Sequence, residues 1–309
     1  MDNKSVMPPQ SGREAEKAVD LKLGRGARVE RNQPISEVRV IMNKTDLNAY
    51  LTKLGLPREL PADLETLHKV HVAQHRSLPF ENFDIALQRG ISVEIEDIIQ
   101  KTVYHSRGGY CFELNGLMLE VLNTLGFEAR SLLGRVHVSG TPTGRSHQIT
   151  LVTLDEQAWI VDVGFGSNTP RAPLPFILNQ VIQTDLQTFR FVEDAQFGYF
   201  LQVLSTDGTD TWNNLYSFDL EFVFAGDIAC GNFFTSTSPH SRFTSARVAA
   251  KATESGLVTL LNYTLKYTSQ GEQTELELEP GQAYLDALKE YFGIELDAQY
   301  GDLRPLPDA

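Results

Sequence analysis

Cysteine is scarce in this chain of 309 residues, with two in all, at positions 111 and 230. Two cysteines cannot build the disulfide framework of a small secreted protein, so a reducing compartment is the simpler expectation. Long apolar runs are absent as well, since none approaches the roughly 18 residues of a membrane-spanning helix. The first residues also lack the apolar core of a secretory signal. We therefore expect a cytoplasmic protein with no membrane partner.

Positive charge is in short supply too. The chain has 27 Lys and Arg against 40 Asp and Glu, a formal net charge of −13. Such an acidic chain is not a general nucleic-acid binder, although a local basic pocket could still hold one phosphorylated ligand. The hydrophobic content of 41% and the charged content of 22% are ordinary for a globular protein, and the length provides for a sizeable core.

The first 42 residues differ from the rest of the chain. They carry eight Lys and Arg and six Asp and Glu, a balance of +2, which leaves −15 for the remainder. Apolar residues are sparse before ISEVRVIM, and PPQSGREAEK has no helical or strand period. We interpret residues 1–42 as a disordered extension or an added leader, with Met42 as an alternative start.

Helical periodicity dominates residues 43–126. The stretches 46–54 and 63–75 each begin with an aspartate that can cap a helix, and a third helical segment spans 94–106. The most regular pattern begins at Cys111 and ends before Gly126, with apolar residues at positions 114, 117, 118, 121, 122 and 125. We predict a helix there with one buried face.

After Gly126 the hydrophobic period changes to two. Six strand-like segments between 127 and 235 are separated by turn-rich pieces such as SGTPTG, which indicates a barrel or a strongly curved sheet. Residues 236–309 combine further strands with a helix near 281–293. The predicted fold class is α+β, with a helical domain over 43–126, a β domain over 127–235 and a mixed α/β domain over 236–309.

The stretch RGGYCFELN places Cys111 in the first turn of the predicted helix. A helix N-terminus stabilises an anion through its unpaired N–H groups and its dipole, so we expect a lowered thiol pKa and a nucleophile. The two preceding glycines let the main chain approach a reacting carbonyl closely. A buried structural cysteine is the alternative, and position alone leaves both interpretations open.

A histidine and an aspartate lie on one predicted hairpin. With a two-residue loop at 155–156, His147 opposes Gly164, and Asp162 is its diagonal neighbour on the same face. Asp162 can then fix the tautomer of His147 and leave the other ring nitrogen for Cys111. Taken singly, His147 is more often a strand-edge residue and Asp162 a turn or cap carboxylate. Taken with Cys111, they predict a Cys–His–Asp relay.

Five stretches carry a resemblance to a known family. In chain order they are PFENFD, RGGYCFELN, SHQITLV, IVDVGFG and TSTSPHSRF, and they resemble the motifs of the arylamine N-acetyltransferases. The likeness covers about residues 43–245 and continues in outline to the end of the chain. The spacings from Cys111 to His147, 36 positions, and from His147 to Asp162, 15 positions, also agree. The leader before Met42 is not part of the pattern.

The resemblance implies a fold and a reaction. The fold is a helical bundle that carries the cysteine, a β-barrel that carries the histidine and the aspartate, and a C-terminal α/β lid, around a transglutaminase-like and papain-like core. The reaction is ping-pong acetyl transfer with acetyl-CoA as acyl donor and no metal. Cys111 would take the acetyl group as a thioester, and a small arylamine, arylhydrazine or N-hydroxyarylamine would accept it. His147 would move the protons and Asp162 would orient it.

Further positions follow from the resemblance alone. The acceptor pocket would be lined by Phe80, Val136, Phe165 and Phe243. The contacts to CoA would come from Thr143, Gly144, Phe234 and His240. His240 stands where the family carries a small hydroxyl residue, and Ser167 stands where some members carry a basic one. Glu81 and Arg107 would form a structural ion pair that holds the catalytic turn.

Two other signals invite a functional interpretation. His68, His71 and His75 share one helical face, but no further ligand is evident nearby, so we expect a partly buried or solvated histidine face and no metal site. Cys230, in DIACGNFF, follows a strand-like run and is expected in the core.

Three other classes of function remain open at this stage. An amide synthase on the same scaffold would form a macrolactam from an acyl thioester. A thiol hydrolase or protease would share the relay, although the gap between Cys111 and His147 is short for a papain-type chain. A binding protein without catalysis would make the relay accidental.

Overall fold

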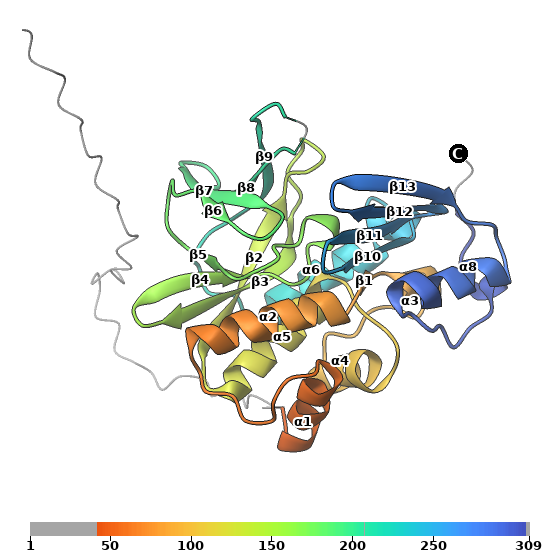
Figure 1. Ribbon diagram of the computed structural model, residues 1–309, viewed down its shortest axis with the longest axis horizontal. Helices are drawn as coiled ribbons and strands as arrows, with labels where there is room; N and C mark the ends of the chain where they lie inside the picture. Colours follow the sequence, from red (N-terminus) through yellow and green to blue (C-terminus); the bar gives the residue numbers. More distant parts are fainter. Residues whose placement is uncertain (1–41, 207, 307–309) are drawn as a thin grey trace, which may run out of the picture.

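The computed structural model describes residues 42–206 and 208–306. The predicted leader, 1–42, therefore lies outside the described residues except for Met42, whose side chain is buried among the helices. Helices and antiparallel strands occupy largely separate stretches of the chain, so the fold is α+β as predicted (Figure 1). No helix within the described ranges is long and apolar enough to cross a membrane.

Helices form the first part of the described chain. They are α1 (Lys44–Lys53), α2 (Leu64–Ser77), α3 (Phe83–Ala86), α4 (Ile95–Ile99) with its π-helical continuation Gln100–Tyr104, and α5 (Cys111–Leu125). Asp63 caps α2 as predicted, because its side chain accepts a hydrogen bond from the main-chain N–H of Thr66. Helix α1 begins earlier than predicted, since Asn43 and not Asp46 is its N-cap.

Helix α5 follows the predicted pattern. It begins at Cys111, and its C-cap is Gly126, whose φ of 97° lies in the left-handed region that glycine tolerates. Its apolar face is buried against the other helices and the sheet. Glu113 in the first turn accepts a hydrogen bond from the main-chain N–H of the N-cap residue, Tyr110, and this bond stabilises the helix N-terminus. The cysteine is therefore held at a defined helix start.

Eight antiparallel strands form the large sheet, in the order β5-β4-β3-β2-β9-β8-β7-β6. Their bounds are β2 (Glu128–Val136), β3 (Arg145–Leu154), β4 (Gln157–Val161), β5 (Leu174–Pro175), β6 (Ile182–Gln183), β7 (Thr188–Asp194), β8 (Gly198–Leu204) and β9 (Trp212–Phe218). The sheet is strongly curved and nearly closed, in agreement with the prediction (Figure 1). Its interior holds an aromatic cluster around Phe176, Phe191 and Phe218.

Five strands form the C-terminal sheet, in the order β1-β10-β11-β12-β13. Their bounds are β1 (Phe80–Glu81), β10 (Val248–Ala252), β11 (Gly256–Leu261), β12 (Thr264–Ser269) and β13 (Glu272–Glu277). Helix α8 (Gln282–Ala287) and its π-helical continuation Leu288–Phe292 pack on this sheet. Strand β1 precedes α5 in the chain but pairs with β10, Phe80 opposite Ala250. The predicted domain boundaries at 126 and 235 stay a prediction, and this pairing crosses both.

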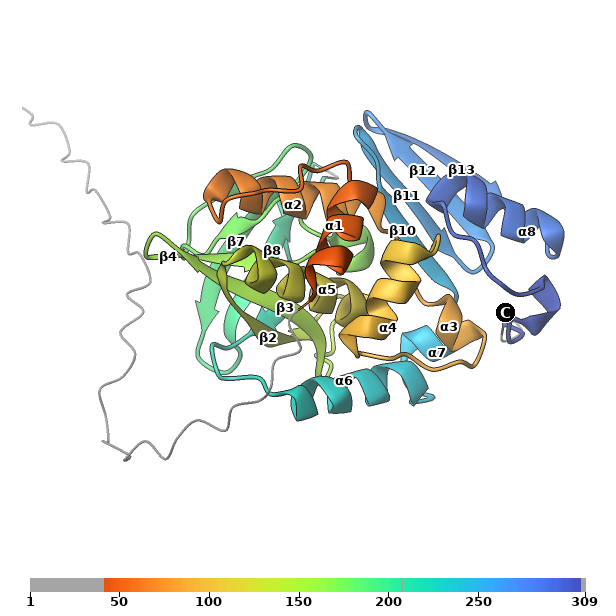
Figure 2. The same cartoon turned by 90° about the horizontal axis from the view of Figure 1, so that it is seen from below.

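Helix α6 (Ala225–Thr237) was not predicted from the sequence, and neither was the short helix α7 (Arg242–Ser245) that follows it. Figure 2 shows α6 along the side of the molecule opposite α2. Its apolar residues lack helical spacing, and a short apolar run does not distinguish a helix from a strand. Cys230 lies on the exposed surface of this helix, so the prediction that it belongs to the core is wrong.

Candidate active site

Two buried side chains of the β3–β4 hairpin contact each other. His147 lies on β3 and Asp162 follows β4, and the Nε2 of His147 donates a hydrogen bond to Asp162 Oδ2 at 2.8 Å. The hairpin has the predicted register, with Leu154 opposite Gln157 across a two-residue turn in which both residues have a positive φ. The ladder ends one residue before Asp162, so the predicted opposition of His147 and Gly164 lies beyond it.

The Asp162 carboxylate is fully buried and ionised. Besides the bond from His147, it accepts hydrogen bonds from Asn115 Nδ2 at 2.9 Å and from the N–H of Gly164 at 3.0 Å. Burial raises the pKa of this carboxyl, but the interaction with His147 and the hydrogen bonds from Asn115 and Gly164 outweigh burial and leave the pKa below its usual value of 3.8. The carboxylate is therefore held in one orientation with its charge directed at the imidazole.

Asn115 connects three segments of the site, and sequence reasoning missed it. Its Nδ2 donates to the carbonyl of Gln148 at 2.6 Å as well as to Asp162, and its Oδ1 accepts from the N–H of Val163 at 2.9 Å. Asn115 lies four residues after Cys111, hence on the same face of α5. That spacing in CFELN was the signal available in the sequence.

Cys111 is only 4% exposed and lies against the strand that carries the histidine. Its Sγ contacts the carbonyl oxygen of Ser146 at 3.7 Å, and the N–H of Gln148 donates to the sulfur. These two residues flank His147 in the chain. Gly164 approaches from another side, because a Cβ built there would lie 3.0 Å from the Cα of Cys111. Helix α5, strand β3 and the segment after β4 therefore converge on the thiol.

The electrostatics of Cys111 differ from the expectation. Burial raises the pKa of the thiol to about 12, and the Asp162 carboxylate adds to the rise, while the N–H groups of Gln148 and Phe112 offset only part of it. The prediction of a pKa lowered by the helix N-terminus is wrong here, because desolvation exceeds the stabilisation by main-chain dipoles. Burial therefore disfavours the thiolate form of Cys111.

Aromatic rings surround the imidazole of His147. The ring centroid of Phe165 lies 4.7 Å from that of His147, and the centroid of Tyr216 lies 5.0 Å from it. Val136, at the end of β2, is paired with Tyr216. No motif singled out Tyr216, whose buried hydroxyl has no hydrogen-bond partner of standard geometry within the described ranges. Burial raises the pKa of this hydroxyl well above 10, and the nearby Asp162 raises it further.

Phe80 and Phe243 form a second aromatic group beside the first. Their ring centroids are 5.9 Å apart. Gly166, the residue after Phe165, faces Phe80, since a Cβ built on Gly166 would lie 3.7 Å from the Phe80 ring. The structure thus gathers Phe80, Phe165 and Phe243, three of the four acceptor residues implied by the resemblance, on the side of the site where Phe165 contacts His147.

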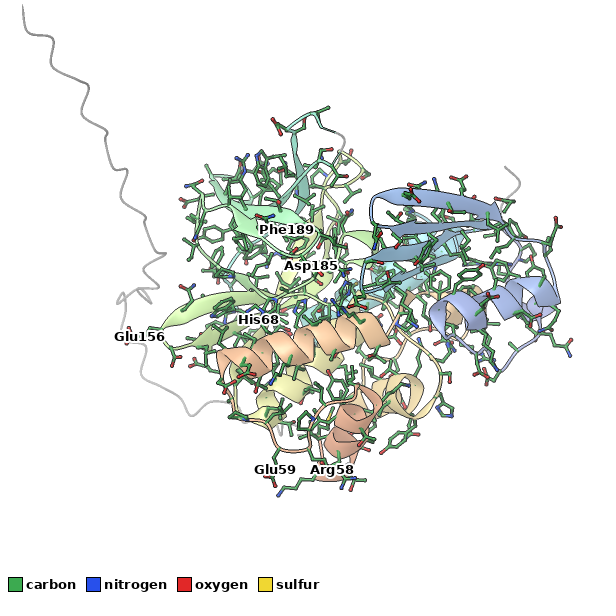
Figure 3. The ribbon with its side chains drawn as sticks, viewed as in Figure 1. Arg58, Glu59, His68, Glu156, Asp185 and Phe189 are labelled. Carbon is green, nitrogen blue, oxygen red and sulfur yellow. The ribbon has the colours of Figure 1, made fainter. Side chains whose placement is uncertain are left out.

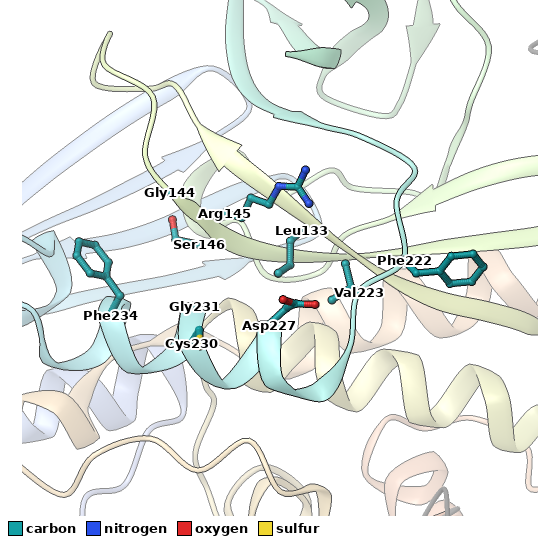
Figure 4. Close-up of a pocket in the computed structure, with 10 residues that line it drawn as sticks. All are labelled: Leu133, Gly144, Arg145, Ser146, Phe222, Val223, Asp227, Cys230, Gly231 and Phe234. Carbon is teal, nitrogen blue, oxygen red and sulfur yellow. The ribbon is translucent and has the colours of Figure 1, made fainter. Parts of the chain in front are cut away.

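A groove of about 400 Å³ opens between the start of β3 and helix α6 (Figure 4). Its walls include Gly144, Arg145 and Ser146 from the strand side and Asp227, Cys230, Gly231 and Phe234 from the helix side. Gly144 and Phe234 are two of the four residues implied as CoA contacts. Ser146 belongs both to this groove and, through its carbonyl, to the contact with Cys111.

The other two implied CoA contacts are not among the residues that line this groove. The hydroxyl of Thr143 is engaged locally, since it donates to the carbonyl of Gly144 at 2.8 Å and accepts from the N–H of Val136 at 2.9 Å. His240 is exposed in the turn between α6 and α7, where its main-chain N–H donates to Ser238 Oγ. Thr143 Oγ1 also lies 2.9 Å from the Oγ of Ser146, a residue of the groove wall, so the role of the full set stays a prediction.

Five charged residues form a buried network at the start of α5. Arg107 contacts Glu81 at 2.9 Å and Asp84 at 3.0 Å, while Lys101 contacts Asp84 at 2.6 Å and Glu113 at 2.7 Å. The predicted pair of Glu81 and Arg107 is confirmed, and it is part of a larger arrangement than the sequence indicated. The network joins the PFENFD stretch, the RGGYC turn and the first turn of α5.

The charges of this network stabilise one another. Burial raises the pKa of Glu81, but Lys101 and Arg107 together outweigh burial and lower the pKa to about 2. Burial also opposes the charged forms of Lys101 and Arg107, yet the surrounding carboxylates raise both pKa values. For Glu113 burial is the larger effect, and its pKa is raised in spite of Lys101.

Two of the three histidines of α2, His71 and His75, are more deeply buried than predicted, while His68 is partly buried as predicted. His71 is fully buried, and its Nε2 donates to the carbonyl of Pro170 at 2.9 Å. Burial lowers the pKa of His71 to about 4 and that of His75 to about 3, while His68 packs its ring against Trp159. No group of three His, Cys, Asp or Glu side chains that could hold a metal ion occurs in the part of the chain that the structure describes.

The chain is similar in sequence to proteins of known function. A family model described as N-acetyltransferase matches residues 63–300. The chain is 34% identical over 260 residues to the arylamine N-acetyltransferase of Escherichia coli strain K12, a match that covers 82% of this chain and 91% of the relative. The chain belongs to the arylamine N-acetyltransferase family. It is therefore an acetyltransferase.

Solved structures of arylamine N-acetyltransferases share the fold of this member. The Mycobacterium marinum enzyme in complex with CoA superposes with a TM-score of 0.77 at 31% identity, over 84% of this chain and 97% of that one. The Bacillus cereus enzyme, which has a Cys-His-Glu catalytic triad, gives a TM-score of 0.75 at 25% identity, over 82% of this chain and 100% of that one. The α+β architecture described above is thus an arylamine N-acetyltransferase fold.

Proposed function

We propose that the protein transfers an acetyl group from acetyl-CoA to arylamines and arylhydrazines by a ping-pong mechanism through an acetyl-Cys111 thioester. One observation carries the proposal. The buried thiol of Cys111 lies against the main chain on both sides of His147, and Nε2 of that imidazole is hydrogen-bonded to Asp162. Because Nε2 is bonded to Asp162, Nδ1 is the nitrogen left for the thiol. A relative with a Cys-His-Glu triad supports the same kind of relay.

In the first half-reaction His147 acts as the base. Its Nε2 keeps a proton to donate to Asp162, so Nδ1 carries a lone pair that can take the proton of Cys111. With a thiol pKa near 12, transfer to the imidazole replaces ionisation into bulk water, and the ionised Asp162 stabilises the imidazolium that forms. The thiolate attacks the acetyl carbonyl, the thioester forms, and His147 returns the proton to the departing CoA sulfur.

In the second half-reaction the amine nitrogen attacks the carbonyl carbon of the acetyl-Cys111 thioester. His147 accepts a proton from the attacking nitrogen, the carbon–sulfur bond breaks, and the proton returns to the sulfur of Cys111 as the amide leaves. Phe80, Phe165 and Phe243 are suited to hold the flat ring of such an amine against the thioester, because aromatic rings pack well against one another.

The groove between β3 and α6 supports acetyl-CoA as the donor. Gly144 exposes main-chain atoms at its rim and Phe234 contributes a ring that is 49% exposed, while Ser146 connects the groove to the thiol (Figure 4). A relative of this family was solved with CoA bound, which supports the same ligand here. The proposal assigns the acyl donor to the α6 side of the site and the aromatic acceptor to the side of Phe80.

Intact-mass spectrometry tests the proposal directly. Acetyl-CoA added without any amine should increase the mass of the protein by one acetyl group, which peptide mapping should locate on Cys111. An aromatic amine added next should discharge the label and yield one equivalent of the acetylated amine. Label on Cys230, or no label at all, would contradict the mechanism. Discharge to water at the same rate with and without amine would indicate a thiol hydrolase.

A further inference from the structure

Arg171 connects the large sheet to the C-terminal sheet. Its guanidinium donates from Nη1 to the carbonyl of Gly256 at 3.0 Å and from Nη2 to the carbonyls of Thr253 at 2.8 Å and Glu254 at 3.2 Å. Its Nε donates to Asp185 at 2.7 Å. Arg171 is 8% exposed, so its guanidinium is shielded from bulk water, while the side chain of Asp185 is 44% exposed. A buried guanidinium with this many fixed acceptors holds its partners in one relative position.

On the side of the large sheet, Arg171 lies near the end of the loop 162–173, which connects β4 to β5. Phe165 lies on the same loop and contacts the imidazole of the site. The end of the loop is also bound to helix α2, since the imidazole of His71 donates to the carbonyl of Pro170 at 2.9 Å. The loop that carries Phe165 is therefore fixed at Asp162, at Pro170 and at Arg171.

On the side of the C-terminal sheet, the three carbonyls belong to the turn 253–256 between β10 and β11. Strand β10 leads directly from this turn to Ala250, which is paired with Phe80 on β1. Phe80 in turn faces Gly166 on the loop, at the hypothetical Cβ distance of 3.7 Å given above. Arg171 thus couples the loop of Phe165 to the strand of Phe80 through the turn and β10.

We propose that Arg171 is a positioning residue that sets the spacing between Phe165 and Phe80, and with it the width of the site for the aromatic ring of the acceptor. This inference rests on the proposed function. The carbonyls of the turn cannot move without β10, and the guanidinium matches them as a planar fork. A lysine at this position would offer a single point of attachment and could not hold the three carbonyls in the same way.

Arg171 forms an ion pair with Asp185, which Figure 3 shows between the two sheets, above α2. Partial burial raises the pKa of Asp185, but the bond and the charge of Arg171 lower it below its usual value. Arg76 contacts the same carboxylate at 3.6 Å and makes no hydrogen bond to the turn 253–256 in the described structure. Arg76 is therefore a matched control, since it shares the carboxylate but not the connection between the sheets.

The test separates the two half-reactions in the full chain. In Arg171→Ala and Arg171→Lys, the burst of p-nitrophenolate from p-nitrophenyl acetate without amine should keep its rate within about twofold, whereas the KM for aniline should rise roughly tenfold. The KM for 2-aminofluorene, a wider ring system, should rise less, so the preference shifts toward larger acceptors. Added guanidinium ion should partly restore the aniline KM in the alanine variant.

The control variant Arg76→Ala should keep both KM values. A cooperative thermal unfolding transition establishes that each variant is folded. If Arg171→Ala does not fold, Arg171→Lys provides the same test. An unchanged ratio of the two KM values in a folded Arg171 variant would overturn the inference, and so would an equal loss in both half-reactions. Absence of acetyl-Cys111 in the unmodified protein would instead refute the proposed function on which the inference rests.

Discussion

The two cysteines of the chain occupy opposite environments. Cys111 is 4% exposed at the start of α5, against the strand of His147, whereas Cys230 is exposed on α6 and forms part of a groove wall. Accessibility alone would favour Cys230 as the reactive thiol. The residues that line the groove around Cys230 include no histidine, while the buried thiol contacts the main chain on both sides of His147, whose imidazole is hydrogen-bonded to Asp162. Reactivity is therefore expected to follow from the neighbours of a thiol more than from its exposure.

The largest expected effect on activity comes from replacing each of the two cysteines separately by alanine. Cys111→Ala should abolish acetyl transfer and leave the fold intact, because the variant keeps the helix start and removes only the sulfur. Cys230→Ala, the matched control, removes a thiol from the groove wall and no reacting atom, so at saturating acetyl-CoA it should keep the turnover of the unmodified protein. Turnover of an aromatic amine with acetyl-CoA measures both. Substantial activity in Cys111→Ala would reverse the comparison between the two sites.

Next in size is the loss of the carboxylate behind the imidazole. Asp162→Asn keeps the shape of the side chain but removes the charge that holds His147 in the required tautomer, so the rate should fall roughly 10³–10⁴-fold, as for aspartate loss in serine-protease triads. Asp219→Asn is a suitable control, because Asp219 pairs at the surface with Arg145, two residues before the histidine. The measurement is the steady-state kcat of both variants, and a near-normal kcat in Asp162→Asn would reject the relay.

A smaller effect is expected from the amide that joins the three segments. Asn115→Ala removes the donors to Gln148 and Asp162 and should lower kcat about 10–100-fold through misplacement of the carboxylate. Asn123→Ala is the control on the same helix, since the buried Nδ2 of Asn123 has no partner within the described ranges. If both variants lose the same activity, helix stability and not the position of Asp162 is responsible.

The features predicted correctly depend on short-range patterns. Helix α5 was predictable because its apolar spacing, its first residue Cys111 and its C-cap Gly126 all lie within sixteen consecutive positions. The register of the β3–β4 hairpin was predictable because a two-residue turn fixes every opposing pair. The contact of His147 with Asp162 followed from that register, and the resemblance in the motifs added the family.

The features missed depend on the tertiary structure. Helix α6 has no apolar period, and its surface position follows only from packing against β3. The raised pKa of Cys111 results from complete burial by segments far away in the chain, which no local motif specifies. Tyr216 reaches the imidazole from β9, distant in sequence. Arg171 likewise gains its partners Gly256 and Thr253 across more than eighty positions.

The N-termini of the two helices that carry the cysteines are stabilised in different ways. The start of α5 is held by the buried network of Glu81, Lys101 and Arg107, whereas Asp227 caps α6 at an exposed position. Since the pKa of Glu81 is lowered from 4.5 to about 2, its contribution to stability is present above pH 4.5 and is lost as the pH falls toward 2. Glu81→Gln should therefore lower the free energy of unfolding by roughly 3 kcal/mol at pH 7.

Urea unfolding at pH 7 and at steps down to pH 3 measures this difference. The gap between the unmodified protein and Glu81→Gln should narrow as the pH falls below 4.5, because the unmodified protein then loses the stabilisation that the variant already lacks. Glu275→Gln, which breaks an exposed pair with Lys266, should change stability by less than about 1 kcal/mol at any of these pH values. A gap for Glu81→Gln that stays constant with pH would show that shape, and not the charge of Glu81, anchors the start of α5.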